Sequence, residues 1–299
     1  MTFACGQCGA ALAFDGVRTA SCPYCASPSF VERPPAAGQP EPRFVVTFTS
    51  DAAGARRSLG RWLGSRSWFA DPALRRARVE DLRGIYVPAY LYSAVAQADY
   101  NAQIAEHYFE RETRKKPDGT TEQRTVTRTE YRPLSGRHLS YVTDVVVSAS
   151  AGLGHGELGA IEPFDFRRMR RFSPALVTGW IAEEFSRDAD DCRVATHAEA
   201  LEQIGSKLRR FMPGDGFSDL HWRAAIHWEA MDPVLVPVWM FAVRYRDDRP
   251  PLRVAINGQT GRTTTLAGKV PLSWPRVIAG IVVLAAVVAL ILWGLRDHL

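Results

Sequence analysis

Cysteine is the residue type with the clearest chemistry in this sequence. Four of the five cysteines form two C-x-x-C pairs with thirteen residues between them, namely Cys5, Cys8, Cys22 and Cys25. Thiolates are soft ligands, and four of them at this spacing bind zinc tetrahedrally. We therefore predict one structural Zn²⁺ per chain, with iron as the competing metal. Four protein ligands leave no open coordination position, so the metal is not expected to act on a substrate.

The second pair has an alternative interpretation, because Cys22-Pro23-Tyr24-Cys25 also matches the redox motif of glutaredoxins. That motif needs a thioredoxin-like βαβ context, whereas here another C-x-x-C pair precedes it and a proline-rich stretch follows. Paired C-x-x-C motifs without a signal peptide favour metal binding in a reducing compartment. Gly9 follows the first pair, where we expect left-handed backbone.

Other residues with chemical potential carry weaker signals. Cys192 has acidic neighbours that disfavour its thiolate, so we expect an incidental helix residue. His221 and His227 lie six residues apart on one strand face, about 20 Å, which is too far to share a metal. Residues 154–159 spell G-x-G-x-x-G, which we interpret as a flexible loop because Pro163 follows closely. With no catalytic pattern visible, we predict that the protein is not an enzyme and see no small-molecule substrate.

The charge balance is basic, with a net charge of +5 and 33 arginines against 4 lysines. This composition fits an anionic partner such as nucleic acid, but the arginines are scattered along the chain. We favour a solvated face for the cluster Arg167–Arg171, with lipid headgroups or nucleic acid as the alternatives. The carboxylate pair Glu183-Glu184 is likewise interpreted as solvated surface.

Composition along the chain predicts α+β architecture with distinct segments. Proline-rich residues after the cysteines cannot continue regular structure, and they indicate a linker and a domain boundary. The predicted organisation is a zinc ribbon at 1–30, a linker at 31–43, an α+β body at 44–268, a juxtamembrane segment at 269–276, a transmembrane helix at 277–295 and a short tail at 296–299.

Within the body we expect an antiparallel-sheet-rich fold. A strand at 44–48 precedes a helix that Ser50 or Asp51 caps and that runs to about Ser65. Leu220 to Glu229 alternates strictly between apolar and polar residues, as a half-buried strand does. Further predicted elements are a hairpin tip at 115–119, helices near 173–186 and 196–211, and a turn at 257–261.

Two apolar, aromatic segments resemble each other, Tyr86–Tyr92 and Leu235–Phe241. Each carries a proline near its start, where a missing N–H is tolerated, and each is expected to lead into a more polar extension that ends in a turn. The body is therefore predicted to contain an internal duplication of two antiparallel units.

The run Val277–Leu295 contains no charged residue. Nineteen residues at about 1.5 Å each span about 28 Å, which is enough for a hydrocarbon core. Trp274 and Trp293 suit the two interfaces, and basic residues dominate the N-terminal side. We therefore expect a tail-anchored, single-pass protein of the cell inner membrane with its N-terminal bulk in the cytoplasm.

The cysteine motifs with their flanking residues, from Phe3 to Cys25, resemble the transcription-factor-IIB-type zinc ribbons of bacteria. The segments 84–88, 235–239 and 257–261 ahead of an apolar C-terminal run extend the likeness to a family of uncharacterised bacterial membrane-anchored zinc-ribbon proteins. Some members are labelled primosomal helicase-like, but no Walker motif is present here. Ala26 departs from the glycine that often follows the second pair.

The function that these features favour is a non-enzymatic adaptor or assembly factor that makes protein–protein contacts at the cytoplasmic membrane face. The alternative is a nucleic-acid-binding protein that uses the ribbon and arginine-rich helices, with Arg56, Arg57 and Arg61 on one helix face.

Overall fold

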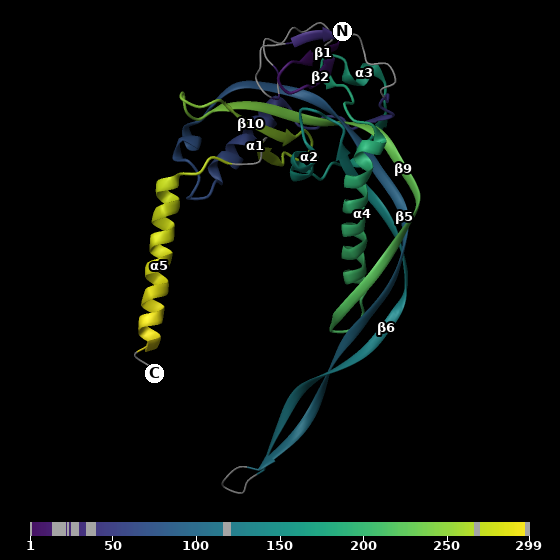
Figure 1. Cartoon of the computed structure of the whole chain (residues 1–299), viewed down its shortest axis with the longest axis vertical. Helices are drawn as coiled ribbons and strands as arrows, with labels where there is room; N and C mark the ends of the chain where they lie inside the picture. The colour runs from purple at the N-terminus through teal and green to yellow at the C-terminus, as the bar shows by residue number, and fades with distance from the viewer. Residues whose placement is uncertain are drawn as a thin grey trace. The chain divides into compact units, whose positions relative to one another are not determined.

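The computed structural model describes residues 2–13, 22, 24, 30–33, 40–115, 121–265 and 270–296. The fold is a sheet-rich α+β fold (Figure 1). The chain divides into two compact units: unit 1 comprises Met1–Tyr90, Val147–Cys192 and Asp232–Leu299, and unit 2 comprises Leu91–Val146 and Arg193–Met231. Cys25 and residues 34–39 of the predicted linker lie outside the described residues, as do residues 116–119 of the predicted hairpin tip.

Strands dominate the described chain. They are β1 (Thr2–Cys5), β2 (Ala11–Ala13), β3 (Phe30–Arg33), β4 (Phe44–Val45), β5 (Arg78–Lys115), β6 (Thr121–Ser148), β7 (Arg170–Arg171), β8 (Ile181–Glu183), β9 (Gly216–Arg244), β10 (Leu252–Asn257) and β11 (Thr263–Thr265). The helices are α1 (Ala52–Gly64), η1 (Pro72–Arg76), α2 (His155–Ile161), η2 (Phe166–Arg168), α3 (Pro174–Val177), α4 (Ala189–Phe211) and α5 (Trp274–Arg296).

The sheet is mixed rather than purely antiparallel. Its hydrogen-bonded order is β11-β10-β9-β5-β8-β2-β1-β3, while β4 pairs with both β7 and β9, and β6 pairs with β5. Two pairs are parallel: Phe44 lies opposite Val234 in β4–β9, and Ile85 lies opposite Ile181 in β5–β8. The antiparallel prediction is therefore wrong for these pairs. Long connections separate their partners in sequence, as parallel pairing requires.

Helix α1 packs on the core of unit 1 as the sequence predicts. Asp51 is its N-cap, with Oδ1 accepting a hydrogen bond from the Gly54 amide at 2.7 Å, and Ser65 is its C-cap. Leu59 is buried among side chains of β9 and β10. The members of this core cluster are Ala55, Leu59, Trp239, Phe241, Val243, Val254 and Ile256.

Unit 2 is built from α4 and the long strands. Ala200, Ile204 and Leu208 on α4 are fully buried, as are alternate residues of the strands. Gln203 of α4 donates its side-chain N–H to the Thr143 carbonyl of β6 at 2.9 Å. The helix therefore covers one face of this part of the sheet.

The predicted alternation in β9 is confirmed from Leu220 to Ile226 and fails at Trp228. Trp228 has φ +51° and is 85% exposed. The alternation of side chains between the two faces of the strand is therefore interrupted at this residue. Glu229 consequently joins His197 of α4, with 2.8 Å between Glu229 Oε2 and His197 Nε2. A left-handed residue inside a strand cannot be predicted from hydrophobic periodicity.

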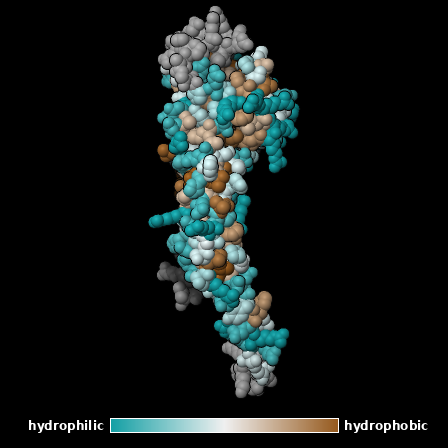
Figure 2. All heavy atoms as spheres, turned by 90° about the vertical axis from the view of Figure 1, so that its right-hand side faces the viewer, coloured by the Kyte–Doolittle hydropathy of each residue, from teal (hydrophilic) through white to brown (hydrophobic). Residues whose placement is uncertain are grey.

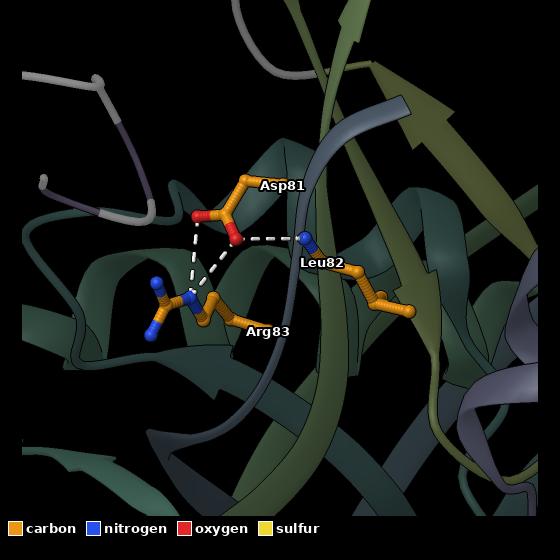
Figure 3. A network of polar contacts seen from close by, with 3 residues as sticks. All are labelled: Asp81, Leu82 and Arg83. Carbon is orange, nitrogen blue, oxygen red and sulfur yellow. Dashed lines mark hydrogen bonds and ion pairs between the residues drawn. The ribbon is translucent and has the colours of Figure 1, made fainter. Parts of the chain in front are cut away.

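Strand β5 opens on a small polar network in unit 1 (Figure 3). One carboxylate oxygen of Asp81 accepts hydrogen bonds from the Leu82 amide at 2.9 Å and from Arg83 Nε at 3.0 Å. Asp81 and Arg83 lie two residues apart, and side chains at that spacing share one face of a strand. The ion pair is partly exposed and is expected to contribute under about 1 kcal/mol.

The two similar segments with prolines lie in β5 and β9, which are neighbours in the sheet order. In β5 the polar extension follows the segment, whereas in β9 it precedes the segment, because the chain enters and leaves unit 2 through these strands. The internal duplication stays a prediction.

The predicted transmembrane helix is corrected. Among the described residues, no helix is long and apolar enough to cross a membrane. Residues 277–295 lie in α5, Trp274–Arg296. The transmembrane helix at 277–295, the tail anchor and the inner-membrane location are therefore wrong as predicted.

The helix predicted near 173–186 is also wrong. This region forms only the one-turn helix α3 and then strand β8. Pro174 starts α3, and Gly179 adopts φ +80°, a conformation that ends a helix. The strand that follows, β8, places Glu183 in the interior of unit 1.

Candidate metal centre

Three of the four predicted ligands lie together. The sulfur atoms of Cys5, Cys8 and Cys22 lie within 4.8 Å of one another, and Cys5 and Cys22 are buried. The Cys8 and Cys22 sulfurs are 3.7 Å apart. In a tetrahedral site with metal–sulfur bonds of about 2.3 Å, neighbouring sulfurs are about 3.8 Å apart. The three cysteines therefore lie close enough to hold a metal ion.

A tight turn between β1 and β2 brings Cys5 and Cys8 together. The Gly9 amide donates to the Cys5 carbonyl at 2.9 Å, and the Cys5 amide donates to the Ala10 carbonyl at 2.9 Å. Gly9 has φ +74°, as predicted, and this conformation is costly for residues with a Cβ atom. Two residues between the cysteines thus suffice for both sulfurs to face one point.

The three short strands around the cysteines form an antiparallel sheet. Phe3 lies opposite Leu12 in the β1–β2 pair, and Cys5 lies opposite Phe30 in the β1–β3 pair. Strand β3 runs to Arg33, so regular structure continues past the predicted end of the ribbon at residue 30. We refer to β1, β2 and β3 with Cys22 and Tyr24 as the ribbon.

The ribbon is joined to the sheet of unit 1. Leu12 of β2 lies opposite Glu183 of β8, and the Glu184 amide donates to the Ala11 carbonyl at 2.8 Å. Strand β8 pairs in turn with β5. The ribbon therefore extends the sheet of unit 1.

A buried polar network lies beside the cysteines. Tyr24, two residues after Cys22, is 3% exposed, and its hydroxyl donates to the Oε2 atom of Glu183, which is 2% exposed. Ser150 Oγ donates to the same oxygen at 2.6 Å. The amides of Ala151 and Gly152 donate to Oε1 at 3.0 and 3.3 Å. Both carboxylate oxygens thus have protein partners.

Burial dominates the electrostatics of this carboxyl group. Removal from water raises the pKa of Glu183 from 4.5 to about 7, and the hydrogen bonds from Ser150, Tyr24 and the two amides oppose this increase. Burial, followed by the nearby Glu183 charge, raises the pKa of Tyr24 well above its usual range, so the phenol keeps its proton. Tyr24 is therefore the donor in this contact.

Gly152 makes room for the Tyr24 ring. A Cβ atom on Gly152 would lie 2.3 Å from Tyr24 Cδ2, far inside van der Waals contact. The loop after β6 thus supplies both the amides that bind Glu183 and the space that the tyrosine fills. A substitution at Gly152 should displace the ring rather than merely crowd it.

The other candidate residues lie elsewhere. Cys192 is in α4, 2% exposed, with its sulfur 3.7 Å from the Ser148 carbonyl, and burial raises the pKa of its thiol. This agrees with the expectation of an unreactive helix residue. His221 and His227 lie on the exposed side of β9, where Arg223 also lies. Residues 155–161 form α2, so the G-x-G-x-x-G stretch is helical and not a flexible loop.

Sequence reasoning missed Glu183, Ser150 and Gly152. Glu183-Glu184 was interpreted as solvated surface because acidic pairs are usually exposed, and the expected helix concealed the strand alternation. The burial pattern of β8 places Ile181 and Glu183 on the inner side. The aromatic residue inside the second C-x-x-C pair was the one available signal, since a buried tyrosine needs a polar partner.

Comparison with known proteins adds little about function. No family model matches the chain. The uncharacterized protein YdjG of Bacillus subtilis (strain 168) is 24% identical over 249 residues, which cover 81% of this chain and 67% of that protein. No solved structure matches. The relative's printed name assigns it no activity.

Proposed function

We propose that this protein is a non-enzymatic adaptor, in which a structural zinc ion stabilises the ribbon and a sheet face of unit 2 binds a protein partner. The zinc would be held by Cys5, Cys8 and Cys22, with Cys25 as the fourth ligand. The support for zinc is the all-sulfur donor set and the 3.7 Å separation of two sulfurs, which suits a tetrahedral ion. Four sulfur ligands would leave no position for a substrate.

The observation that carries the adaptor function is an exposed apolar surface in unit 2. On β6, Ser140 and Val142 are buried, whereas Leu139 is 70% and Tyr141 is 73% exposed. Because neighbouring residues on a strand point to opposite faces, the last two point away from the α4 side. Large apolar residues at such exposure are characteristic of protein-binding surfaces when they gather on one face.

Two further apolar side chains are exposed on the hairpin of β5 and β6. Ion pairs of Arg128 with Glu110 and Glu112, and of Arg132 with Glu106, define the alignment of the two strands. These charged residues are even-numbered, so the odd-numbered Phe109, 76% exposed, and Tyr131, 59% exposed, share the opposite face. Figure 2 shows hydrophobic side chains, in brown, exposed among hydrophilic ones on the surface.

We define the adaptor face as Phe109, Tyr131, Leu139 and Tyr141. Aromatic anchors in a polar surround are the usual energetic centres of protein interfaces. The described acidic and basic residues of the hairpin are extensively paired with each other, which leaves the apolar side chains as the main attractive feature. A partner with a complementary apolar surface is therefore expected.

A cross-linking experiment tests the adaptor function. A photoreactive amino acid at position 139 in the full-length chain should capture one defined protein after nuclease treatment, and Leu139→Glu combined with Tyr141→Glu should reduce binding of that protein at least tenfold. The matched control is Val194→Glu, because Val194 is 81% exposed but lies on α4. Binding that survives the double variant, or that the control abolishes equally, would contradict the proposal.

The same experiment distinguishes a nucleic-acid partner from a protein partner. Arg56, Arg57 and Arg61 are exposed on α1, as predicted, and they favour this second candidate. Capture that disappears on nuclease treatment, together with binding that decreases steeply with salt and weakens in Arg56→Ala with Arg57→Ala, would favour nucleic acid over a protein partner.

A further inference from the structure

A basic hollow in unit 1 is not used by the adaptor function. It measures about 650 Å³ and is lined by Thr47, Phe48, Thr49 and residues 167–170. The size is within the range of small-molecule sites, roughly 300 to 1,000 Å³. Two stretches that are far apart in sequence form its walls, one after β4 and the other from η2 to β7.

Three arginines give this hollow its charge. Arg167, Arg168 and Arg170 all line it. Arg168 Nε lies 3.3 Å from Asp165 Oδ2, so its charge is partly balanced. For Arg167 and Arg170, no carboxylate partner is found among the described residues, and both are exposed. Two guanidinium groups are therefore available to an anion.

The two walls are held at a defined separation. Gln259 bridges them: its side-chain oxygen accepts from the Asp165 amide at 2.8 Å, and its carbonyl accepts from Thr49 Oγ1 at 3.2 Å. Arg170 is fixed by the β4–β7 pair, where it lies opposite Val45. Asp165 also accepts from the Arg167 amide at 3.2 Å. The backbone carrying the arginines is thus ordered before a ligand arrives.

Two hydroxyl groups add to the lining of the hollow, those of Thr47 and Thr49. Phe48 lies between them in sequence, and its ring packs against the core of unit 1, stacked on Trp180 with ring centroids 4.2 Å apart and an interplanar angle of 12°. Guanidinium groups form bidentate hydrogen bonds with phosphate, and hydroxyl groups add further donors.

We propose that this hollow binds a phosphate-bearing ligand of about nucleotide size, with Arg167 and Arg170 on the phosphate. The phosphate can belong to a free nucleotide or to a nucleotide within a strand. Arg168 contributes less because Asp165 shares its charge.

Calorimetric titration of the full-length protein at 50 mM salt tests this inference, with pyrophosphate, ATP and a ten-residue oligothymidylate as probes. Binding of ATP with a dissociation constant below 1 mM indicates a free nucleotide, and binding of the oligonucleotide alone indicates a strand. Arg167→Ala with Arg170→Ala should weaken the binding at least tenfold. Lack of binding by all three probes would overturn the proposal.

The matched control is Arg75→Ala with Arg76→Ala, which removes two exposed arginines of η1 that do not line the hollow. This control should change the affinity less than twofold. Equal weakening by both double variants would show a response to net charge only and would overturn the proposal. Thr47→Val provides a second variant, expected to weaken binding by threefold or more without removing charge. Unchanged melting temperatures will show that each variant is folded.

Discussion

The hydroxyl group of Tyr24 donates a hydrogen bond to Glu183 Oε2, across 159 residues of sequence. Tyr24 belongs to the ribbon that carries the cysteines, and Glu183 belongs to β8 within the sheet of unit 1. Both side chains are almost completely buried. The candidate metal centre is therefore connected to the sheet by a side-chain contact as well as by the β2–β8 pair.

The Tyr24–Glu183 contact should be measurable as a coupling energy. We expect Tyr24→Phe and Glu183→Gln each to lower the free energy of unfolding by about 1 to 3 kcal/mol, because each leaves a buried polar group with one partner fewer. The double variant should lose less unfolding free energy than the sum of the two single losses, by about 1 kcal/mol or more. Urea denaturation of the four proteins provides the measurement.

The control for that cycle is Tyr108→Phe, because Tyr108 is 47% exposed on β5. When Tyr108→Phe is combined with Glu183→Gln, the loss in free energy of unfolding should equal the sum of the two single losses. Additivity in the Tyr24 cycle as well would show that the two side chains do not stabilise each other.

The raised pKa of Glu183 predicts a pH dependence. Its pKa is about 7 in the folded protein, compared with 4.5 for an ordinary glutamate such as that of the unfolded chain. The folded protein therefore binds the proton more tightly than the unfolded chain does. The stabilising contribution is therefore fully present below about pH 4.5 and is lost as pH rises through about 7, by roughly 3 kcal/mol in total. The stability difference between wild type and Glu183→Gln should decrease over this interval. A difference that does not change from pH 5 to pH 8 would show that the pKa is not raised.

Gly152 should tolerate no side chain. Gly152→Ala places a Cβ 2.3 Å from Tyr24 Cδ2, and we expect a loss of about 2 kcal/mol or more in the free energy of unfolding. Gly60→Ala is the matched control, since no atom lies within 4 Å of its added Cβ in α1. That substitution should stabilise the protein by about 0.5 to 1 kcal/mol. Thermal unfolding of the two variants is the comparison, and similar effects would contradict the packing described here.

Asn257 should be a second sensitive position. It is fully buried, its Nδ2 donates to the Ile161 and Pro163 carbonyls at 2.9 and 3.1 Å, and its Oδ1 accepts from the Gln259 and Thr260 amides. Asn257→Ala should cost about 2 to 3 kcal/mol, because several buried groups lose partners together. The exposed Asn101 of β5 gives a control whose alanine variant should differ from wild type by under about 0.5 kcal/mol. A near-neutral Asn257→Ala in denaturant unfolding would refute this interpretation.

Local patterns allowed part of this structure to be predicted. Asp51 at the start of α1, the alternation from Leu220 to Ile226 and the conformation of Gly9 follow from short-range rules that the structure obeys. Three cysteines were also placed correctly in one cluster, because ligand spacing in a C-x-x-C pair is determined by a single tight turn.

Long-range pairing could not be predicted from the same rules. The burial of Glu183 depends on β8 lying between β2 and β5, and no local signal specifies those partners. The left-handed conformation of Trp228 is likewise imposed by its surroundings, since an aromatic residue has no intrinsic preference for φ +51°. The transmembrane helix predicted at 277–295 is overturned, since among the described residues no helix is long and apolar enough to cross a membrane.

Zinc content measured per chain tests the central claim most directly. The full-length protein, purified without added chelator, should contain about one zinc ion per chain by mass spectrometry. Cys5→Ser, Cys8→Ser and Cys22→Ser should each lose most of it, whereas Cys192→Ser should retain it, because Cys192 lies in α4 outside the cluster. Full zinc retention in the three cluster variants, or its absence from the wild-type protein, would contradict the account.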